Sequence, residues 1–260
     1  MTARTIEYLS PPAPVSMGDR WFDISPIDHF WVRRRFEVFR RLAGGFLQES
    51  QNMAEVGCGH GLVQRQIEEA YGREITGFDL NEVALKQNQS LRSSVCCYDI
   101  CQRAPQFHRR FDCIVMFDVL EHIDDEDGFL QAVMFHLAPG GCLAVNVPAG
   151  QWLYSAYDQV DGHKRRYSIG RLERVVMRNG YTLVRSSYWG LPLVPVLMLR
   201  KLLLTRSYGD ANAVAVGFDS RNKAINRMLG WLSSCEIVPQ RILGTSVMAI
   251  FRSPSDPIGA

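Results

Sequence analysis

Three glycines at alternate positions, Gly57, Gly59 and Gly61, follow the acidic residue Glu55 and a short apolar run. Glycines at a turn from a strand to a helix let a ligand approach the bare backbone. A dinucleotide site has the spacing G-x-G-x-x-G with a small last residue, but here the third glycine comes one position early and Leu62 fills that place. The turn therefore favours a ligand other than a pyrophosphate. Glu55 favours a ligand that carries a positive charge, such as an ammonium or a sulfonium.

Further acidic residues follow later predicted strands. Asp79, Asp99 and Asp118 each come directly after an apolar stretch. In a parallel sheet with helices on both faces, ligands bind at the carboxyl ends of the strands near the switch in winding direction. Any one of these acids alone could be an ordinary solvated loop residue. Four successive strands that end in this way, the first at Glu55, predict a binding site.

The elements that must position these residues alternate along the chain. We expect a long N-terminal helix over Asp28–Leu47, and helices from the glycine turn to Ala70, from Asn81, over Glu126–Leu137, and from Ser168 to Asn179. The predicted strands are Asn52–Val56, Glu74–Phe78, a short strand before Asp99, Phe111–Phe117, Cys142–Val147, Tyr181–Tyr188 and Thr245–Phe251. This alternation predicts an α/β protein with a doubly wound, mostly parallel sheet.

Composition narrows the class of protein. The net charge of +2 over 260 residues is too small to indicate a nucleic-acid partner. The seven cysteines lack regular spacing, so we expect reduced thiols and a cytoplasmic location.

Residues 1–27 are expected to be a flexible, proline-containing arm without a leader. The apolar stretch Leu191–Leu204 is too short to cross a membrane. We expect it to cap a cavity, and loose association with a membrane surface stays open.

From Asn52 to Tyr188, and again in the final strand, the chain resembles the class I S-adenosylmethionine-dependent methyltransferases. The glycine turn, the acids at the strand ends and the segment Phe117-Asp118-Val119-Leu120-Glu121-His122 carry this resemblance. It implies a Rossmann-like fold with seven strands, the last of them antiparallel beside the sixth. It also implies one domain over residues 28–189 and 244–253, and a helical cap insertion over residues 190–243.

The resemblance also implies a cofactor site for S-adenosylmethionine, with S-adenosylhomocysteine as the product. Glu55 and the turn would receive the methionine part, Asp79 the two ribose hydroxyls, and Asp99 with Ile100 the adenine. Carboxylate oxygens suit both a vicinal diol and an exocyclic amine. The full set of predicted cofactor residues is Glu55, Gly57, Cys58, Gly59, Gly61, Asp79, Leu80, Asp99, Ile100, Phe117, Asp118, Val119 and His122.

The segments His29–Arg33 and Gly162–Ser168 resemble more narrowly the bacterial methyltransferases of the ubiquinone-biosynthesis type. Those proteins commonly serve small-molecule, natural-product, glycan or lipid pathways. The resemblance therefore implies a small-molecule acceptor, for which we favour methylation at oxygen over nitrogen. The apolar residues after Trp189 suggest that the acceptor has an apolar portion, although the same residues could pack on the domain or form a dimer interface.

Two histidines are candidates for a general base, a role that a hydroxyl acceptor needs. His163, in the loop after the fifth predicted strand, is the first candidate, and His122 is the second. The alternative for the loop is that its charged residues only anchor it through hydrogen bonds. Predicted acceptor contacts are Tyr157, Arg165, Arg166 and Tyr167.

Asp118, Glu121 and His122 have helical i, i+3, i+4 spacing, and some relatives with Glu in place of the Asp bind a divalent metal there. The shorter Asp favours a metal-free site. Two other classes of function stay open: an NAD-dependent oxidoreductase or epimerase, and a non-catalytic scaffold that keeps the fold. The sequence leaves monomer and homodimer equally open.

Overall fold

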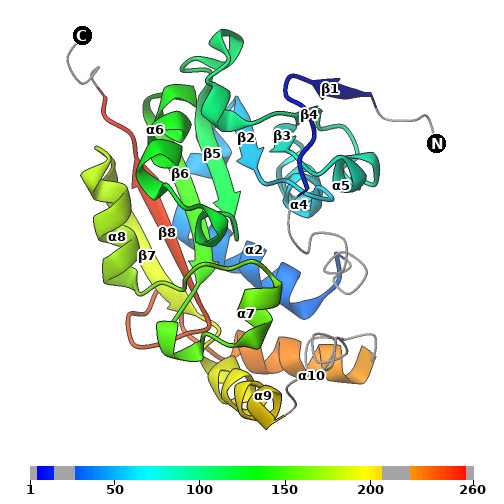
Figure 1. Cartoon of the computed structure of the whole chain (residues 1–260), viewed down its shortest axis with the longest axis vertical. Helices are drawn as coiled ribbons and strands as arrows, with labels where there is room; N and C mark the ends of the chain where they lie inside the picture. The colour runs from blue at the N-terminus through cyan, green and yellow to red at the C-terminus, as the bar shows by residue number, and fades with distance from the viewer. Residues whose placement is uncertain (1–4, 15–26, 207–222, 256–260) are drawn as a thin grey trace.

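The computed structural model describes residues 5–14, 27–206 and 223–255. Within them, one sheet of eight strands has the order β1-β4-β3-β2-β5-β6-β8-β7 (Figure 1). Its strands are β1 (Ile6–Tyr8), β2 (Met53–Val56), β3 (Ile75–Asp79), β4 (Val95–Cys97), β5 (Phe111–Phe117), β6 (Leu137–Pro148), β7 (Thr182–Trp189) and β8 (Ser246–Arg252). The pairs from β1 to β6 are parallel, and β8 runs antiparallel between β6 and β7. The predicted pairing of the last two strands is thus confirmed.

The described residues form eight strands and not the predicted seven, and part of the predicted flexible arm is ordered. Ile6–Tyr8 forms the edge strand β1, which pairs in parallel with β4. The arm is fixed further by the Tyr8 hydroxyl, which donates to Glu82, and by the Ser10 hydroxyl, which accepts a bond from the Asp99 backbone N–H. Residues 15–26 of the predicted arm lie outside the described residues.

Helices cover both faces of the sheet because the central strands are apolar on both sides. Alternate residues of β5 show this division: Ile114 and Met116 pack into one core cluster, and Cys113 and Val115 into the other. The first cluster includes α6 (Glu126–His136) and α8 (Ile169–Arg178). The second includes α2 (Phe30–Ala43) and α4 (Leu62–Tyr71).

The remaining helices are short or lie late in the chain. They are α3 (Phe46–Glu49), α5 (Glu82–Lys86), α7 (Ala156–Val160), α9 (Val194–Arg206) and α10 (Lys223–Ser234), with the single turns η1 (Ile100–Gln102), η2 (Pro105–Phe107), η3 (Leu120–His122), η4 (Gln151–Leu153) and η5 (Leu191–Leu193). Asn81 and Ser168 cap α5 and α8 as predicted, since each side chain accepts a backbone N–H in the first turn. The predicted N-terminal helix is interrupted, because Gly44 takes φ of 52° and ends α2 before α3 begins.

The segment between β7 and β8 contains η5, α9 and α10, within the predicted insertion 190–243; residues 207–222 of it lie outside the described residues. α9 packs on α7 and α10 on α2, at the end of the molecule where the parallel strands have their carboxyl ends (Figure 1). Among the described residues, none of the helices combines the length and the apolar content that crossing a bilayer needs.

Candidate active site

A cavity of about 390 Å³ lies at the carboxyl ends of the central parallel strands. Its walls come from the turns after β2, β3, β4, β5 and β6, and from α2, α7 and α9. The predicted residues that line it are Glu55, Gly57, Cys58, Gly59, Asp79, Leu80, Asp99, Ile100, Phe117, Asp118, Val119, His122, Tyr157, His163 and Arg166. The sheet therefore brings together, in one cavity, residues that are more than 100 positions apart in the sequence.

The glycine turn joins β2 to α4 in a conformation that side chains rarely adopt. Gly57 has φ of 74°, and a Cβ atom there would lie 2.4 Å from a methyl group of Val119. Gly61 has φ of 71° and precedes the first residue of α4, but it is not among the described residues that line the cavity. Gly57 and Gly59 thus expose their backbone to the cavity, whereas Gly61 allows the chain to turn into α4.

Glu55 is the penultimate residue of β2, lines the cavity and is 3 % exposed. Burial raises the pKa of its carboxyl well above the usual range, whereas the Arg35 guanidinium acts in the opposite direction. Its Oε2 atom has no hydrogen-bond partner among the described residues. A buried acceptor without a donor costs free energy, so the site is completed by a ligand that brings a cation or an N–H group.

Asp79 and Asp99 hold the turns that follow β3 and β4. One oxygen of Asp79 accepts the Gly59 N–H at 2.7 Å, and the other accepts the Asn81 N–H at 2.8 Å. Burial raises the pKa of Asp79. Asp99 caps the turn that contains Ile100 by accepting the Cys101 N–H at 2.9 Å. Both carboxyls keep lone pairs for a ligand after these bonds, since a carboxylate offers about four acceptor positions.

Asp118 follows β5 with φ of 56°, in the left-handed region that is uncommon for residues other than glycine. Its Oδ2 atom pairs with the Arg35 guanidinium at 2.6 Å, and its Oδ1 atom accepts an N–H of Asn146 at 2.7 Å. Arg35 in turn lies over the ring of Phe117. Both oxygens of Asp118 are therefore engaged by α2 and β6, and Asp118 fixes the turn that carries Glu121 and His122.

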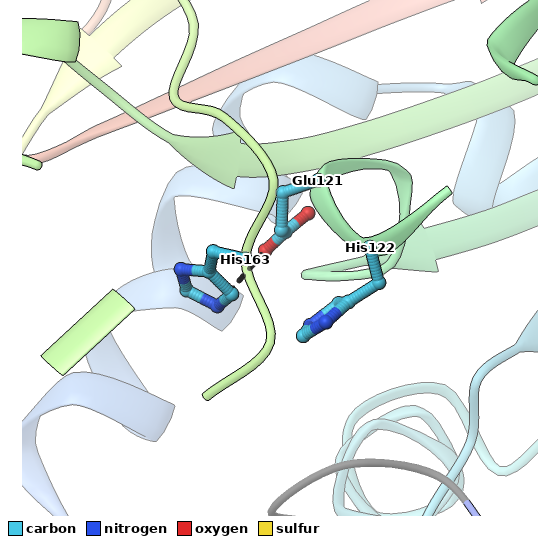
Figure 2. A group of neighbouring side chains, drawn as sticks. All are labelled: Glu121, His122 and His163. Atoms are coloured by element: carbon cyan, nitrogen blue, oxygen red, sulfur yellow. Dashed lines mark ion pairs between the residues drawn. The ribbon is translucent and has the colours of Figure 1, made fainter. Parts of the chain in front are cut away.

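Figure 2 shows Glu121 and His122 on the turn after β5, facing His163 on the loop after β6. Glu121 is fully buried, and neither of its carboxylate oxygens has a hydrogen bond among the described residues. Its Oε1 atom lies 3.9 Å from Nε2 of His163 (Figure 2). Burial raises the pKa of Glu121 well above its usual range, and Asp118 adds to this effect.

His163 is held between carboxylates. Its Nδ1 lies 2.9 Å from Asp158 and its Nε2 lies 3.1 Å from Asp161, so both ring nitrogens act as donors. Although burial alone would lower it, these bonds and the charge of Glu121 raise the pKa of His163 to about 10. This geometry does not favour the predicted role of His163 as a general base, because an imidazolium has no lone pair to accept a proton.

His122 has the opposite environment. Burial and the charge of His163 lower its pKa, so the ring is neutral near neutral pH. Its Nδ1 atom has no hydrogen-bond partner among the described residues. The two histidine rings lie edge to face with centroids 4.8 Å apart. One ring is thus a fixed cation, and the other is a neutral group that can accept a proton at the cavity wall.

Glu121, His122 and His163 each offer one ligand atom within 4.8 Å of one another, an arrangement that could hold a metal ion. The fit is partial for two reasons. His163 would have to lose its proton and a bond to a carboxylate, and Asp118 already has both oxygens engaged. The geometry therefore favours the metal-free chemistry of these side chains.

The four predicted acceptor contacts divide into two groups. Tyr157 and Arg166 line the cavity, and Arg166 is anchored by Asp158 at 2.7 Å. Arg165 and Tyr167 are not among the described residues that line it. Arg165 donates to the Ile123 carbonyl and pairs with Glu126, and the buried Tyr167 hydroxyl donates to Glu126 at 2.6 Å. These two residues anchor the loop, as the alternative interpretation held.

Several lining residues were not singled out from the sequence as parts of the site. Trp31 and Arg35 come from α2, and Leu197 and Arg200 come from α9. The near-helical spacing of α2 indicated a packed helix but could not show which end reaches the cavity. Asp158, which holds both His163 and Arg166, lies three positions after the α7 cap Ser155 and reads as an ordinary capping acid.

Comparisons with known proteins show the family of the chain. A family model described as a methyltransferase domain matches residues 21–186. The chain is 27 % identical over 136 residues to a ubiquinone biosynthesis O-methyltransferase of Bordetella avium, covering 48 % of this chain and 55 % of the relative. It is 30 % identical over 97 residues to a protein of the same name from Chromobacterium violaceum, covering 35 % of this chain and 41 % of the relative. The chain thus spans about half the length, or less, of these curated relatives.

The fold is shared with solved structures. A phosphoethanolamine N-methyltransferase of Haemonchus contortus in complex with S-adenosylmethionine superposes with a TM-score of 0.57 at 18 % identity, over 86 % of this chain and 53 % of that chain. At this identity the likeness concerns the fold alone. The family model, however, covers well over half of the chain. The chain belongs to the methyltransferase-domain family, within the class I methyltransferases whose cofactor is S-adenosylmethionine.

Proposed function

We propose that this protein transfers the methyl group of S-adenosylmethionine to a small-molecule acceptor, at oxygen in preference to nitrogen. One observation carries the proposal. A single cavity joins the glycine turn and the acids after β2, β3 and β4 to a second group of side chains, formed by Glu121, His122, His163 and Arg166. The first part suits the cofactor, and the second suits an acceptor that must lose a proton.

In the proposed binding mode, Glu55 and the exposed backbone of Gly57 and Gly59 receive the methionine part of the cofactor. The unpaired Oε2 of Glu55 supports this assignment, because the cofactor's ammonium would supply the donor that is missing there. Asp79 would receive the ribose hydroxyls, and Asp99 with Ile100 the adenine. A pyrophosphate would instead bring negative charge to Glu55 and Asp79, which argues against the nicotinamide-dependent alternative.

The proposed reaction is an in-line displacement. The acceptor oxygen forms a bond to the methyl carbon while the carbon–sulfur bond breaks. The electron pair of the broken bond stays on sulfur, which becomes the sulfur of a thioether. The hydroxyl proton passes to His122, whose neutral ring has an unbonded Nδ1. The enzyme otherwise aligns the reactants and excludes water. His163 and Arg166, both anchored on Asp158, position the acceptor side of the cavity.

A methyl-transfer screen tests this proposal. The purified protein is incubated with S-adenosylmethionine and with phenols, sugars, carboxylates and amines as separate groups of acceptors, and formation of S-adenosylhomocysteine is measured. We expect turnover with a hydroxyl-bearing acceptor. Turnover with amines alone would show that the acceptor atom is nitrogen and not oxygen. Binding of NAD but not of S-adenosylmethionine in a thermal-shift assay would contradict the proposal as a whole.

The non-catalytic alternative makes a different prediction. A scaffold that keeps the fold needs no proton acceptor beside the cofactor, yet His122 and the buried Glu121 face the cavity without hydrogen-bond partners for their Nδ1 and carboxylate oxygens, respectively. Buried polar groups of this kind cost free energy unless a ligand satisfies them. They therefore favour an enzyme over a scaffold.

A further inference from the structure

Large apolar side chains are exposed on the two helices between β7 and β8. Met198 and Leu199 of α9 are 52 % and 58 % exposed, and Met228 and Trp231 of α10 are 59 % and 71 % exposed. We refer to these four residues as the α9–α10 face. Several large exposed apolar side chains on neighbouring elements indicate a site of interaction with another apolar surface, and both helices contact η5.

α9 is apolar nearly all round, so both of its sides need cover. On one side Leu197 and Arg200 line the cavity. On the other side Met198 and Leu199 are exposed. A helix that is apolar on every side is stable only when it is buried or when it lies in an apolar environment. Among the described side chains of α9, Met198, Leu199 and Leu202 are thus the large apolar ones left more than half exposed.

The charges around this face have one sign. Lys201 of α9 and Lys223 and Arg227 of α10 are basic, whereas Arg200 lies on the cavity side over the Tyr157 ring, and the described side chains of the two helices include no acidic residue. A second copy of the chain related by a two-fold axis would bring these cations together, which costs free energy. Anionic lipid headgroups would neutralise them. The charge therefore favours a lipid surface over self-association.

Both helices lie at the same end of the molecule, where each packs against η5 (Figure 1). Trp152 of η4 is 46 % exposed beside them, and its carbonyl accepts a bond from Lys201. Exposed tryptophan, methionine and leucine next to lysine and arginine are typical of helices that lie in the interface of a bilayer. The same end of the molecule holds the cavity, at the carboxyl ends of β2 to β6.

We propose that the α9–α10 face docks on the surface of a membrane that contains anionic phospholipids. α9 and α10 lie in the interface with the side chains of the α9–α10 face among the acyl chains and with Lys201, Lys223 and Arg227 at the headgroups. The attachment is peripheral, since none of the described helices is able to span a bilayer. The inference does not depend on which acceptor the cavity takes, or on methyl transfer at all.

Vesicle co-sedimentation of the full chain tests this proposal. The vesicles are made of phosphatidylcholine alone, or of phosphatidylcholine and phosphatidylglycerol in equal parts. We expect sedimentation with the anionic vesicles that weakens as salt is added. The double variant Leu199→Gln/Trp231→Gln should lower the partition coefficient at least about tenfold, because it removes two large apolar side chains from the acyl region.

Leu91→Gln is the matched control, because Leu91 is also 58 % exposed but follows α5 on the opposite side of the sheet. It should sediment like the unmodified chain, and all variants should keep the melting temperature and S-adenosylmethionine binding. Equal sedimentation of the double variant and the unmodified chain would overturn the proposal. So would the absence of binding to anionic vesicles, or a dimer in sedimentation velocity that the double variant abolishes.

Discussion

At the scale of single residues, the two histidines at the cavity have similar positions but opposite charge states. His163 donates from both nitrogens to buried or half-buried carboxylates, and His122 has a neutral ring with an unbonded nitrogen. The difference lies in partners that come from α7 and the following loop, not in the histidines themselves. It supports the proposal that His122 accepts the proton and that His163 positions the acceptor side of the cavity.

The first prediction concerns His122. Because its pKa lies below the ordinary value of 6.5, the rate should rise with pH through a limb centred below that value and then stay level. His122→Ala should lower kcat by about 10²–10⁴ and remove this limb. The measurement is the pH profile of kcat, with the exposed His108→Ala as control. A limb that persists in His122→Ala would exclude His122 as the base.

The second prediction concerns the charge of His163. Its folded-state pKa of about 10 lies above the ordinary 6.5, so the stabilisation is complete below pH 6.5 and is lost as pH rises through 10. Its partner Asp158, with a pKa of about 2, contributes stability above its ordinary pKa of 3.8, and this is lost as pH falls toward 2. The stabilisation by His163 is on the order of a few kcal/mol.

Melting temperatures of the unmodified chain and of His163→Gln, recorded from pH 6.5 to pH 10, test this sign. The difference between them should be largest at the lower pH and shrink toward the upper. A difference that stays constant over the range would mean that His163 is neutral throughout. In that case its two ring nitrogens could not both donate, and its assignment as a cation would have to be abandoned.

At the scale of elements, hydrogen bonds fix the loop between β6 and α8 to the turn after β5. The Tyr167 hydroxyl donates to Glu126 at 2.6 Å and lies 3.2 Å from the Leu120 carbonyl, and the Lys164 N–H donates to the Glu121 carbonyl. These bonds set the distance between His163 on the loop and Glu121 on the turn. The loop thus holds the turn after β5 in place, and its residues His163 and Arg166 line the cavity.

The third prediction concerns the hydrogen bonds between this loop and the turn after β5. Tyr167→Phe removes a buried hydrogen bond and should lower the free energy of unfolding by about 1–2 kcal/mol. The Michaelis constant for the acceptor should stay unchanged, because the Tyr167 ring is fully buried and is not among the described residues that line the cavity. Chemical denaturation and steady-state kinetics give the two quantities. A higher Michaelis constant at unchanged stability would restore the direct acceptor contact that the sequence suggested.

The elements differ in how well they could be predicted. The strands that end at Glu55, Asp79 and Asp118 are apolar runs bounded by turn residues, and all three were predicted within a residue or two. β1 was not, because three residues carry no periodicity and its partner Val95–Cys97 is remote in the sequence. The run Arg33–Arg35 was expected on the solvated face of a helix, but Arg35 is buried, and its ion pair with Asp118 depends on how α2 crosses the sheet.

At the scale of the whole molecule, the cofactor part of the site was more predictable than the acceptor part. Glu55, Asp79 and Asp99 end adjacent strands, so the sheet order alone brings them together. The acceptor part is built from three elements that no sheet register connects: the turn after β5, the loop with α7, and α9. Side-chain contacts between such elements determine the protonation states of the histidines and carboxylates at the cavity. A local sequence pattern does not indicate which side chains will make these contacts.

The whole account rests on the binding of S-adenosylmethionine in the cavity, and isothermal titration calorimetry measures this most directly. The unmodified chain should bind S-adenosylmethionine, and Asp79→Asn should bind it about 10–100-fold more weakly, since a hydrogen bond to a charged group contributes roughly 1.5–3 kcal/mol. Glu69→Gln, an acid exposed on α4, should bind like the unmodified chain. An unmodified chain that does not bind, or equal dissociation constants for all three proteins, would contradict the account.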